Sequence, residues 1–293
     1  MAEESTPISC LRNPSVGRED NYRLSPTDHP KKVLIAGGGM AGLEAAITLK
    51  QLKHEPILVD ASDRLGGQFY IAGLAPRKAE MKEAAISRAQ QAADLGVDIR
   101  LNTRVTKEFV KEISPDVLII ATGAKVAPLS IPGSDLDHVL HPFEVLEGTV
   151  SPNGNIVIIG GGLIGLEVAE FLAQDQDNQI TVVEMREDIG LDLGMFRRIC
   201  VMENIYMSGV RPLVSTKSKA ISATGVMVEK DGESLEIPAD YVVIATGTVS
   251  EDHSELTRIA DELSITYHVV GDAKKARRAI DAIHEAAEVS RQI

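Results

Sequence analysis

The sequence predicts an α/β protein with two Rossmann-like dinucleotide-binding domains, the second inserted in the first. Three features predict this fold: a repeated strand, glycine-rich loop and helix; an acid at the end of each unit's second strand; and an Ala-Thr-Gly tripeptide that closes each unit. A chain of 293 residues is long enough for two domains of ordinary size.

Each repeat unit opens with a short apolar strand that runs directly into a glycine-rich loop and then a helix. The first glycine permits the tight turn, the second lets a pyrophosphate approach the backbone, and the third lets the helix pack closely on the sheet. The helix N-terminus adds unpaired N–H groups and a partial positive charge, which favour phosphate. These glycines are Gly37, Gly39 and Gly42 in the first unit, and Gly160, Gly162 and Gly165 in the second.

Each unit continues with a second apolar strand that ends in an acid, Asp60 or Glu184. Such a carboxylate can accept hydrogen bonds from ribose hydroxyls. In both units the acid is followed 61 residues later by the alanine of Ala-Thr-Gly, at Ala121 and Ala245. One glycine run alone can be a plain turn beside a close-packed helix. Two complete units at matched spacing favour two nucleotide sites.

The segments between these motifs carry ordinary signals. We predict an amphipathic helix over 78–95, a strand over 97–101, a loop and then a helix over 185–209, a β-hairpin over 219–238 around Asp231-Gly232, and a final helix over 273–293. Prolines 128, 132 and 142 indicate a linker or crossover between domains. The predicted division is a tail or linker over 1–30, one domain made of 31–124 with 246–293, and an inserted domain over 125–245.

Composition excludes several function classes. Hydrophobic residues at 44% and charged residues at 25% are typical of a soluble globular protein. A net charge of −13 argues against nucleic acid, which needs a concentrated basic face. Apolar runs are too short to span a membrane, and residues 1–30 have no apolar core of a signal peptide. Two distant cysteines form no disulfide framework, so we expect a cytoplasmic protein.

With these motifs, the chain resembles the C-terminal half of the old yellow enzyme-related iron–sulfur flavoproteins: 2,4-dienoyl-CoA reductase, enoate reductases and trimethylamine dehydrogenase. The resemblance covers nearly the whole chain. Its markers are the first glycine loop, the run 65–69 (Leu-Gly-Gly-Gln-Phe), both Ala-Thr-Gly tripeptides, Gly271-Asp272 and the segment 9–19 around Cys10. The resemblance implies that the divided domain holds FAD and that the inserted domain holds NAD(H).

The resemblance assigns cofactor roles residue by residue. The implied FAD site comprises Gly37, Gly39, Met40, Ala41, Gly42, Asp60, Ala61, Arg64, Gly67, Gln68, Val105, Ala121, Thr122, Gly123, Gly271 and Asp272. The implied NAD site comprises Gly160, Gly162, Leu163, Ile164, Gly165, Glu184 and Gly247. Asp272 can also be a plain helix N-cap, and both roles can coexist.

The acid of the second unit bears on the choice of coenzyme. A carboxylate that faces the 2′-hydroxyl would repel the 2′-phosphate of NADP, so Glu184 favours NAD(H). Arg186 stands two residues later and argues the other way, because a nearby arginine can accommodate that phosphate.

Missing residues limit the chemistry. Disulfide reductases of this superfamily use a closely spaced pair of redox cysteines, and the chain has no such pair. Hydride transfer from nicotinamide to flavin needs no protein acid or base, so we assign no catalytic residue and no metal site. His138 and His141 are three residues apart but lack a third ligand. Cys200, between Ile199 and Val201, is expected to pack in the core.

Cys10 matches a cysteine that, in the resembling flavoproteins, is one of four iron–sulfur ligands, the other three lying upstream. The chain begins nine residues before Cys10, so by itself it cannot build that site. It can be a split subunit whose partner supplies an FMN-binding TIM barrel and the other cysteines, a fragment, or a stand-alone reductase with a vestigial tail. A cysteine without a ligand in a flexible tail is the plainest interpretation.

We therefore expect an FAD-dependent NADH oxidoreductase that passes electrons to an Fe–S/FMN partner subunit in a hetero-oligomer. Two alternatives stay open. One is a non-catalytic module that holds ADP, as in trimethylamine dehydrogenase, and the other is a stand-alone NADH:acceptor reductase.

Overall fold

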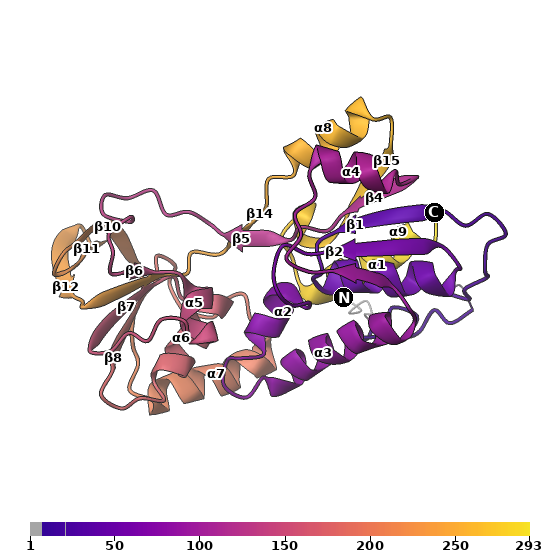
Figure 1. The fold of residues 1–293 in the computed structure, drawn as a ribbon. Coiled ribbons are helices and arrows are strands. Elements are labelled where there is room, and N and C mark those ends of the chain that lie inside the picture. The colour runs from indigo at the N-terminus through magenta and orange to yellow at the C-terminus, as the bar shows by residue number, and fades with distance from the viewer. Residues whose placement is uncertain (1–7, 21) are drawn as a thin grey trace. The chain divides into compact units, whose positions relative to one another are not determined.

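The computed structural model describes residues 8–20 and 22–293, which form two compact units (Figure 1). Unit 1 comprises the described residues up to Tyr70 together with Glu80–Lys125 and Val249–Ile293. Unit 2 comprises Ile71–Ala79 and Val126–Thr248. Each unit contains one five-stranded sheet in which all the paired neighbours run parallel. The predicted α/β class with two Rossmann-like domains is confirmed.

The sheet of unit 1 has the strand order β15-β4-β1-β2-β3. Its strands are β1 (Lys32–Ala36), β2 (Glu55–Val59), β3 (Asp98–Arg100), β4 (Val117–Ile120) and β15 (Thr266–Val269). The helices of this unit are α1 (Met40–Gln51), α2 (Gly67–Ala72, which runs into unit 2), α3 (Ala79–Asp94), α4 (Lys107–Ile113), α8 (Ser254–Glu262) and α9 (Ala279–Ser290), with a short 3-10 helix at Gly271–Ala273.

Helices cover both faces of this sheet, as an all-parallel sheet requires. Alternate residues of β1 point to opposite faces. Val33 and Ile35 join a core cluster with residues of α1, α3 and α9. Leu34 and Ala36 join a second cluster with residues of α4 and α8. Because β1 is buried on both faces, its sequence is a continuous apolar run and not an alternation of apolar and polar residues.

The sheet of unit 2 has the order β6-β13-β7-β8-β9. Its strands are β6 (Val139–Leu140), β7 (Asn155–Ile159), β8 (Gln179–Val183), β9 (Arg211–Leu213) and β13 (Tyr241–Ile244). The helices are α5 (Pro142–Glu147), α6 (Leu163–Leu172) and α7 (Met195–Met207). A separate antiparallel sheet consists of β10 (Thr216–Ser222), β11 (Gly225–Lys230) and β12 (Glu233–Pro238).

The two faces of this second parallel sheet are covered differently. Ile156 and Ile158 of β7 pack in a cluster that includes residues of α5 and α6. Val157 and Ile159 pack in a cluster that includes Val228 and other residues of the antiparallel sheet. The predicted hairpin around Asp231-Gly232 is confirmed as β11–β12, and β10 extends it by one more antiparallel strand.

The chain passes between the units at β5 (Ala124–Val126) and β14 (Thr248–Ser250), which form a two-stranded sheet. It also passes into and out of unit 2 at Ile71–Ala79. Within unit 2, Lys78 of this segment forms a buried ion pair with Glu167 of α6, and Arg77 lies 3.0 Å from Glu170. The predicted domain boundaries remain a prediction, and the sequence carries no signal for this crossing.

The N-terminal segment packs on unit 1 where the structure describes it. The carbonyl oxygen of Cys10 lies 3.0 Å from Nε2 of His284 in α9. Arg12 donates to Oγ of Ser87 at 3.1 Å, and Leu11 packs against the core cluster of α1, α3 and α9. The segment around Cys10 therefore packs against unit 1, whereas a flexible tail was predicted there. Residues 1–7 of the predicted tail lie outside the described residues.

Two details differ from the predictions. Cys200 is exposed and is not in the core. Adjacent helical residues point in directions about 100° apart, so the apolar run at 199–201 is no buried face. The final helix begins at Ala279 and not at Ala273 because a 3-10 turn and a loop intervene. No helix in 8–20 or 22–293 is long and apolar enough to cross a membrane.

Candidate functional site

The two glycine-rich loops have the same backbone geometry. Gly37 and Gly160 both have φ of +111°, in the region that favours glycine. A Cβ atom at Gly37 would overlap the carbonyl oxygen of Ala121, and one at Gly160 would overlap the carbonyl oxygen of Ala245. The first glycine of each loop therefore lies directly against the strand end that carries Ala-Thr-Gly.

The other loop glycines serve two different purposes. A Cβ atom at Gly42 would overlap the carbonyl oxygen of Gly37, and one at Gly165 would overlap that of Gly160. The third glycine thus makes room for the loop itself, not only for the sheet. At Gly39 a Cβ atom would meet nothing within 4 Å. This open position at the start of α1 fits a loop that leaves space for a phosphate-bearing ligand.

The acid of each unit accepts a hydrogen bond from the glycine-rich loop of the same unit. Oδ2 of Asp60 accepts a hydrogen bond from the N–H of Gly38 at 2.6 Å. Oε2 of Glu184 accepts one from the N–H of Gly161 at 2.8 Å. The matching bonds extend the sequence repeat to side-chain geometry. Oδ1 of Asp60 and Oε1 of Glu184 each already accept two hydrogen bonds from nearby residues. Oδ2 of Asp60 and Oε2 of Glu184 each keep a second lone pair, so both acids can still accept a hydrogen bond from a ribose hydroxyl.

Glu184 is almost fully buried and stays ionised. Burial by itself raises the pKa of this carboxyl. Hydrogen bonds from the N–H groups of Arg186 and Gly161 outweigh that effect and leave the pKa below its ordinary value. The guanidinium Nε of Arg186 also donates to Oε1 at 3.2 Å. The arginine therefore turns toward the acid.

Unit 1 brings most of its predicted residues to the carboxyl edge of β1, β2 and β4. The N–H of Gly66 donates to the carbonyl of Gly38 at 2.8 Å, and Gly67 packs against Gly39. Gln68 donates through Nε2 to the carbonyl of Ala124. Open parallel sheets bind ligands at this edge.

The Ala-Thr-Gly tripeptide of unit 1 lies at the same edge. The N–H of Ala121 donates to the carbonyl of Ala36 at 2.8 Å. Gly123 has φ of +79°, and its carbonyl accepts from the N–H of Glu251 at 3.0 Å. Oγ1 of Thr122 is buried without a hydrogen-bond partner. A buried hydroxyl in this state fits a site that is completed by a polar ligand.

Gly271 lies beside the start of α1, where a Cβ atom would be 3.0 Å from the Cβ of Ala41. Oδ1 of Asp272 accepts from the N–H of Arg277 at 3.0 Å, and burial raises the pKa of this carboxyl. Asp272 is not the N-cap of the helix that follows, because that position is Arg278.

The remaining predicted FAD residues lie in three different places. Met40 and Ala41 are buried at the start of α1. Ala61 is exposed, and Arg64 stacks over the ring of Tyr70 at 5.2 Å. Val105 packs in the apolar cluster on the α4 and α8 side of the sheet.

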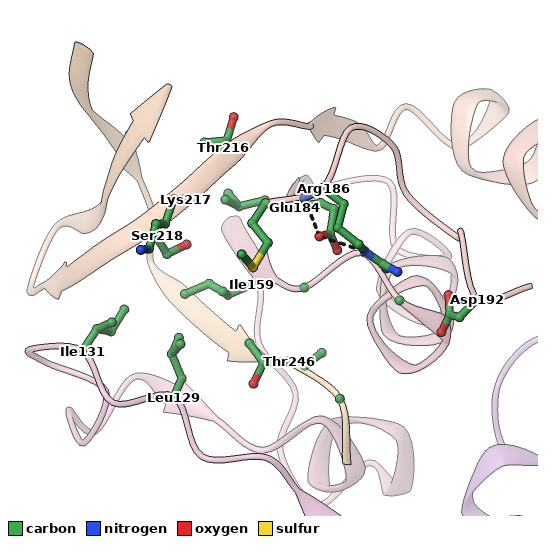
Figure 2. Close-up of a pocket in the computed structure, with 16 residues that line it drawn as sticks. Leu129, Ile131, Ile159, Glu184, Arg186, Asp192, Thr216, Lys217, Ser218 and Thr246 are labelled. Atoms are coloured by element: carbon green, nitrogen blue, oxygen red, sulfur yellow. Dashed lines mark hydrogen bonds and ion pairs between the residues drawn. The ribbon is translucent and has the colours of Figure 1, made fainter. Parts of the chain in front are cut away.

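Unit 2 contains a cavity of about 430 Å³ at the carboxyl end of its sheet (Figure 2). Of the predicted NAD residues, Gly160, Gly162, Glu184 and Gly247 line it. Leu163, Ile164 and Gly165 form the first turn of α6 next to it. The other lining residues come from β7, β8, β10, the linker after β5, the loop before α7 and the tripeptide after β13: Leu129, Ile131, Ile159, Val183, Met185, Arg186, Asp192, Thr216, Lys217, Ser218, Ala245 and Thr246.

Sequence reasoning missed Asp192 and the β10 residues. Oδ2 of Asp192 accepts a hydrogen bond from the N–H of Leu163 at 3.0 Å, at the N-terminus of α6. A carboxylate therefore lies where a helix N-terminus would otherwise attract phosphate. The β10 residues come from a hairpin that follows the acid by about 30 residues. No local motif marks either group.

One of the two linker histidines, His141, has a structural contact. Nδ1 of His141 accepts from the N–H of Phe143 at 3.3 Å, so His141 caps α5. Within the described part of the chain, no three His, Cys, Asp or Glu side chains group as metal ligands.

Comparison with known proteins places the chain in a family. Residues 31–265 match the family described as pyridine nucleotide-disulphide oxidoreductase. Bilirubin reductase of Mediterraneibacter gnavus is 38% identical over 240 residues, which cover 82% of this chain and 37% of the relative. NADH oxidase of Thermoanaerobacter brockii is 35% identical over 298 residues, which cover 98% of this chain and 44% of the relative.

The structure of a 2-naphthoyl-CoA reductase in complex with 2-naphthoyl-CoA superposes with a TM-score of 0.91 and 29% identity. The match covers 97% of this chain and 43% of that protein. The chain thus spans less than half the length of each of these relatives. It belongs to the pyridine nucleotide-disulphide oxidoreductase family and matches the C-terminal half of the old yellow enzyme-related flavoproteins.

Proposed function

We propose that the chain is an FAD-dependent NADH oxidoreductase module that passes electrons onward to a partner Fe–S/FMN module of the enoate or dienoyl-CoA reductase type. The observation that carries the proposal is the duplicated loop, in which the same glycine conformation and the same N–H-to-acid hydrogen bond occur in both units. Two sites of this kind in one chain suit two dinucleotides.

Unit 1 is the proposed FAD site. The open position at Gly39, the unpartnered hydroxyl of Thr122 and the carboxylate of Asp60 supply space and polar groups for a dinucleotide. FAD, when bound, supplies the hydride acceptor, and the protein's share of the chemistry is binding and orientation.

Unit 2 is the proposed NAD(H) site. Its cavity places Glu184, Gly160 and Gly247 together at one sheet edge. The lowered pKa of Glu184 keeps a negative charge beside the position expected for the 2′-hydroxyl, which disfavours a 2′-phosphate. Arg186 is bound to that same carboxylate, so its guanidinium is already engaged. These contacts support NADH over NADPH.

The proposed partner rests on the relatives. More than half of the length of the bilirubin reductase and the NADH oxidase has no counterpart in this chain. A module that binds FMN and an Fe–S cluster is what the sequence resemblance implies for that portion. The proposed assembly is a hetero-oligomer in which this chain receives electrons from NADH and the partner reduces the final substrate.

The nucleotide released when the purified protein is heat-denatured tests the proposal. Release of FAD supports the reductase, whereas release of ADP alone would replace it with the structural ADP-binding module.

Purification from the native host tests the proposed partner. If the purified chain is stable, reduces a dye with NADH and carries no co-purified FMN or iron, it is a stand-alone NADH:acceptor reductase. Iron that co-purifies with wild type but not with Cys10→Ser would assign Cys10 to a shared cluster.

A further inference from the structure

Helix α7 of unit 2 carries apolar side chains on two opposite faces. One face packs on the core of the unit, where Ile205 is buried and Val201 and Met202 pack against the same cluster. The opposite face is open to solvent, although a helix at the surface of a globular protein normally presents polar residues there. Its large apolar side chains are between 59% and 81% exposed: Met195, Phe196, Ile199, Tyr206 and Met207.

The helical spacing gathers these five side chains on one face. Successive residues of a helix are about 100° apart, so the five fall within an arc of about 120°. Glu203 lies within the same arc, and Cys200, which is also exposed, lies at its margin. The apolar face runs along the whole helix, which is about 20 Å long.

The area of this face is that of a protein–protein contact. With about 200 Å² for each large side chain, the five exposed fractions correspond to roughly 700 Å² of apolar surface. The largest apolar patch on a typical monomer is about 300–600 Å². Two copies of the face would together bury about 1,400 Å², which is within the range of about 1,200–2,000 Å² for stable interfaces.

The order of the side chains fits a second copy of the same helix. Met195 and Tyr206 are eleven residues apart, as are Phe196 and Met207. Eleven residues complete three turns plus about 20°, so each pair lies along one line of the helix, with a methionine at one end and an aromatic ring at the other. An antiparallel copy related by a two-fold axis reverses both lines, so each methionine lies opposite a ring of the second copy. Contacts between sulfur and aromatic rings are favourable.

We propose that the exposed face of α7 is the contact surface of a homodimer, in which two α7 helices pack antiparallel around a two-fold axis level with Val201, the middle residue of the helix. Two-fold dimers are the commonest assemblies of identical soluble chains. The inference does not rest on the proposed function, because no nucleotide takes part in the contact.

Glu203 limits the affinity of this dimer. The two-fold axis brings both copies of its carboxylate to the middle of the contact, where like charges repel and lose water. The arginines of the helix do not neutralise it, because Arg197 lies 3.6 Å from Glu167 and Arg198 pairs with Asp188. Removal of this charge should therefore tighten the dimer, and an added acid on the same face should weaken it.

Sedimentation equilibrium of the purified full chain tests the proposal. Ile199→Asp adds a charge to the middle of the face, and Glu203→Gln removes one. The matched control is Ile86→Asp on α3, because Ile86 is also an exposed isoleucine, at 51%, but lies on a helix surface with the exposed polar residues Glu83 and Gln90. Circular dichroism and the melting temperature show that each variant is folded.

Cys200 gives a second readout. Because it lies at the margin of the face, it stays open to reagents in the dimer and lies close to its copy across the two-fold axis. A short bismaleimide should therefore link two wild-type chains covalently, and Cys200→Ser should abolish this product.

The expected result is a wild-type dimer with a micromolar dissociation constant, which rises at least about 30-fold in Ile199→Asp, falls at least about threefold in Glu203→Gln and stays unchanged in Ile86→Asp. A wild-type chain that is monomeric at about 100 µM would overturn the inference. So would a dimer that Ile199→Asp leaves intact, that Glu203→Gln fails to tighten or that Ile86→Asp disrupts equally. A monomeric chain whose α7 face instead binds a different protein would also show that the homodimer is wrong.

Discussion

Asp192 gives the sharpest prediction about nucleotide binding, because its carboxylate lies where the pyrophosphate of NADH is expected. Oδ2 accepts from the N–H of Leu163 at 3.0 Å, at the N-terminus of α6. Two like charges about 4 Å apart repel by about 4 kcal/mol at an effective dielectric constant of 20. The carboxylate must therefore leave this position when the dinucleotide binds.

The variant Asp192→Asn measures how much the displacement of this carboxylate reduces NADH affinity. A hydrogen bond to a charged group contributes about 1.5–3 kcal/mol and a neutral one about 0.5–1.5 kcal/mol. Displacing asparagine should thus cost about 1 kcal/mol less than displacing the carboxylate. The variant should bind NADH about fivefold more tightly. Asparagine still accepts from a helix N-terminus, so the fold should be retained.

The assay is an anaerobic titration of NADH binding in wild type and Asp192→Asn. Asp188→Asn is the matched control, because it removes the same charge from the same loop where Asp188 pairs with Arg198. The control should change NADH affinity by less than twofold, since surface charges are screened by salt. An unchanged or weaker NADH affinity in Asp192→Asn would refute the reasoning and would indicate that the carboxylate contacts the bound dinucleotide favourably.

Three further predictions follow from local geometry. Gly39→Ala should leave the melting temperature of the FAD-free protein unchanged, because the added Cβ meets nothing within 4 Å, yet it should weaken FAD binding at least tenfold. The control Gly194→Ala, at an equally open position, should leave FAD binding unchanged. FAD-binding isotherms of both variants measure the difference. Glu184→Gln should cost about 1 kcal/mol of stability at pH 7 in denaturant titrations. Since the folded-state pKa of Glu184 is lowered from 4.5, this difference should shrink as the pH falls below 4.5; a constant difference would contradict the ionised assignment. Cys200, being exposed, should react with a thiol reagent in native protein faster than half-buried Cys10, as peptide mapping can test.

Much of the fold could be predicted because the deciding signals are local. The tight turn at Gly37 needs a residue without Cβ, and a strand buried on both faces needs a continuous apolar run. Both requirements produce a sequence pattern that can be recognised within a few residues. The acid at the end of the second strand is equally local, although its hydrogen bond to the loop N–H became visible only in the structure.

The features that escaped prediction depend on residues distant in sequence. Ser218 reaches the cavity because β10 hydrogen-bonds to the segment after β8, a pairing with no sequence signature. The segment 71–79 joins unit 2 through the Lys78–Glu167 ion pair, whose members are 89 residues apart. Cys200 was misplaced for the opposite reason, since apolar neighbours in sequence were taken as neighbours on one helix face.

The central claim is that NADH bound in unit 2 reduces FAD bound in unit 1. Anaerobic addition of NADH to FAD-loaded protein, followed by the flavin absorbance, tests it most directly. We predict bleaching with one equivalent of NADH per FAD and slower bleaching with NADPH. In Gly160→Ala, bleaching by NADH should be lost while FAD stays bound. A bound flavin that NADH leaves oxidised in the wild-type protein would contradict the account.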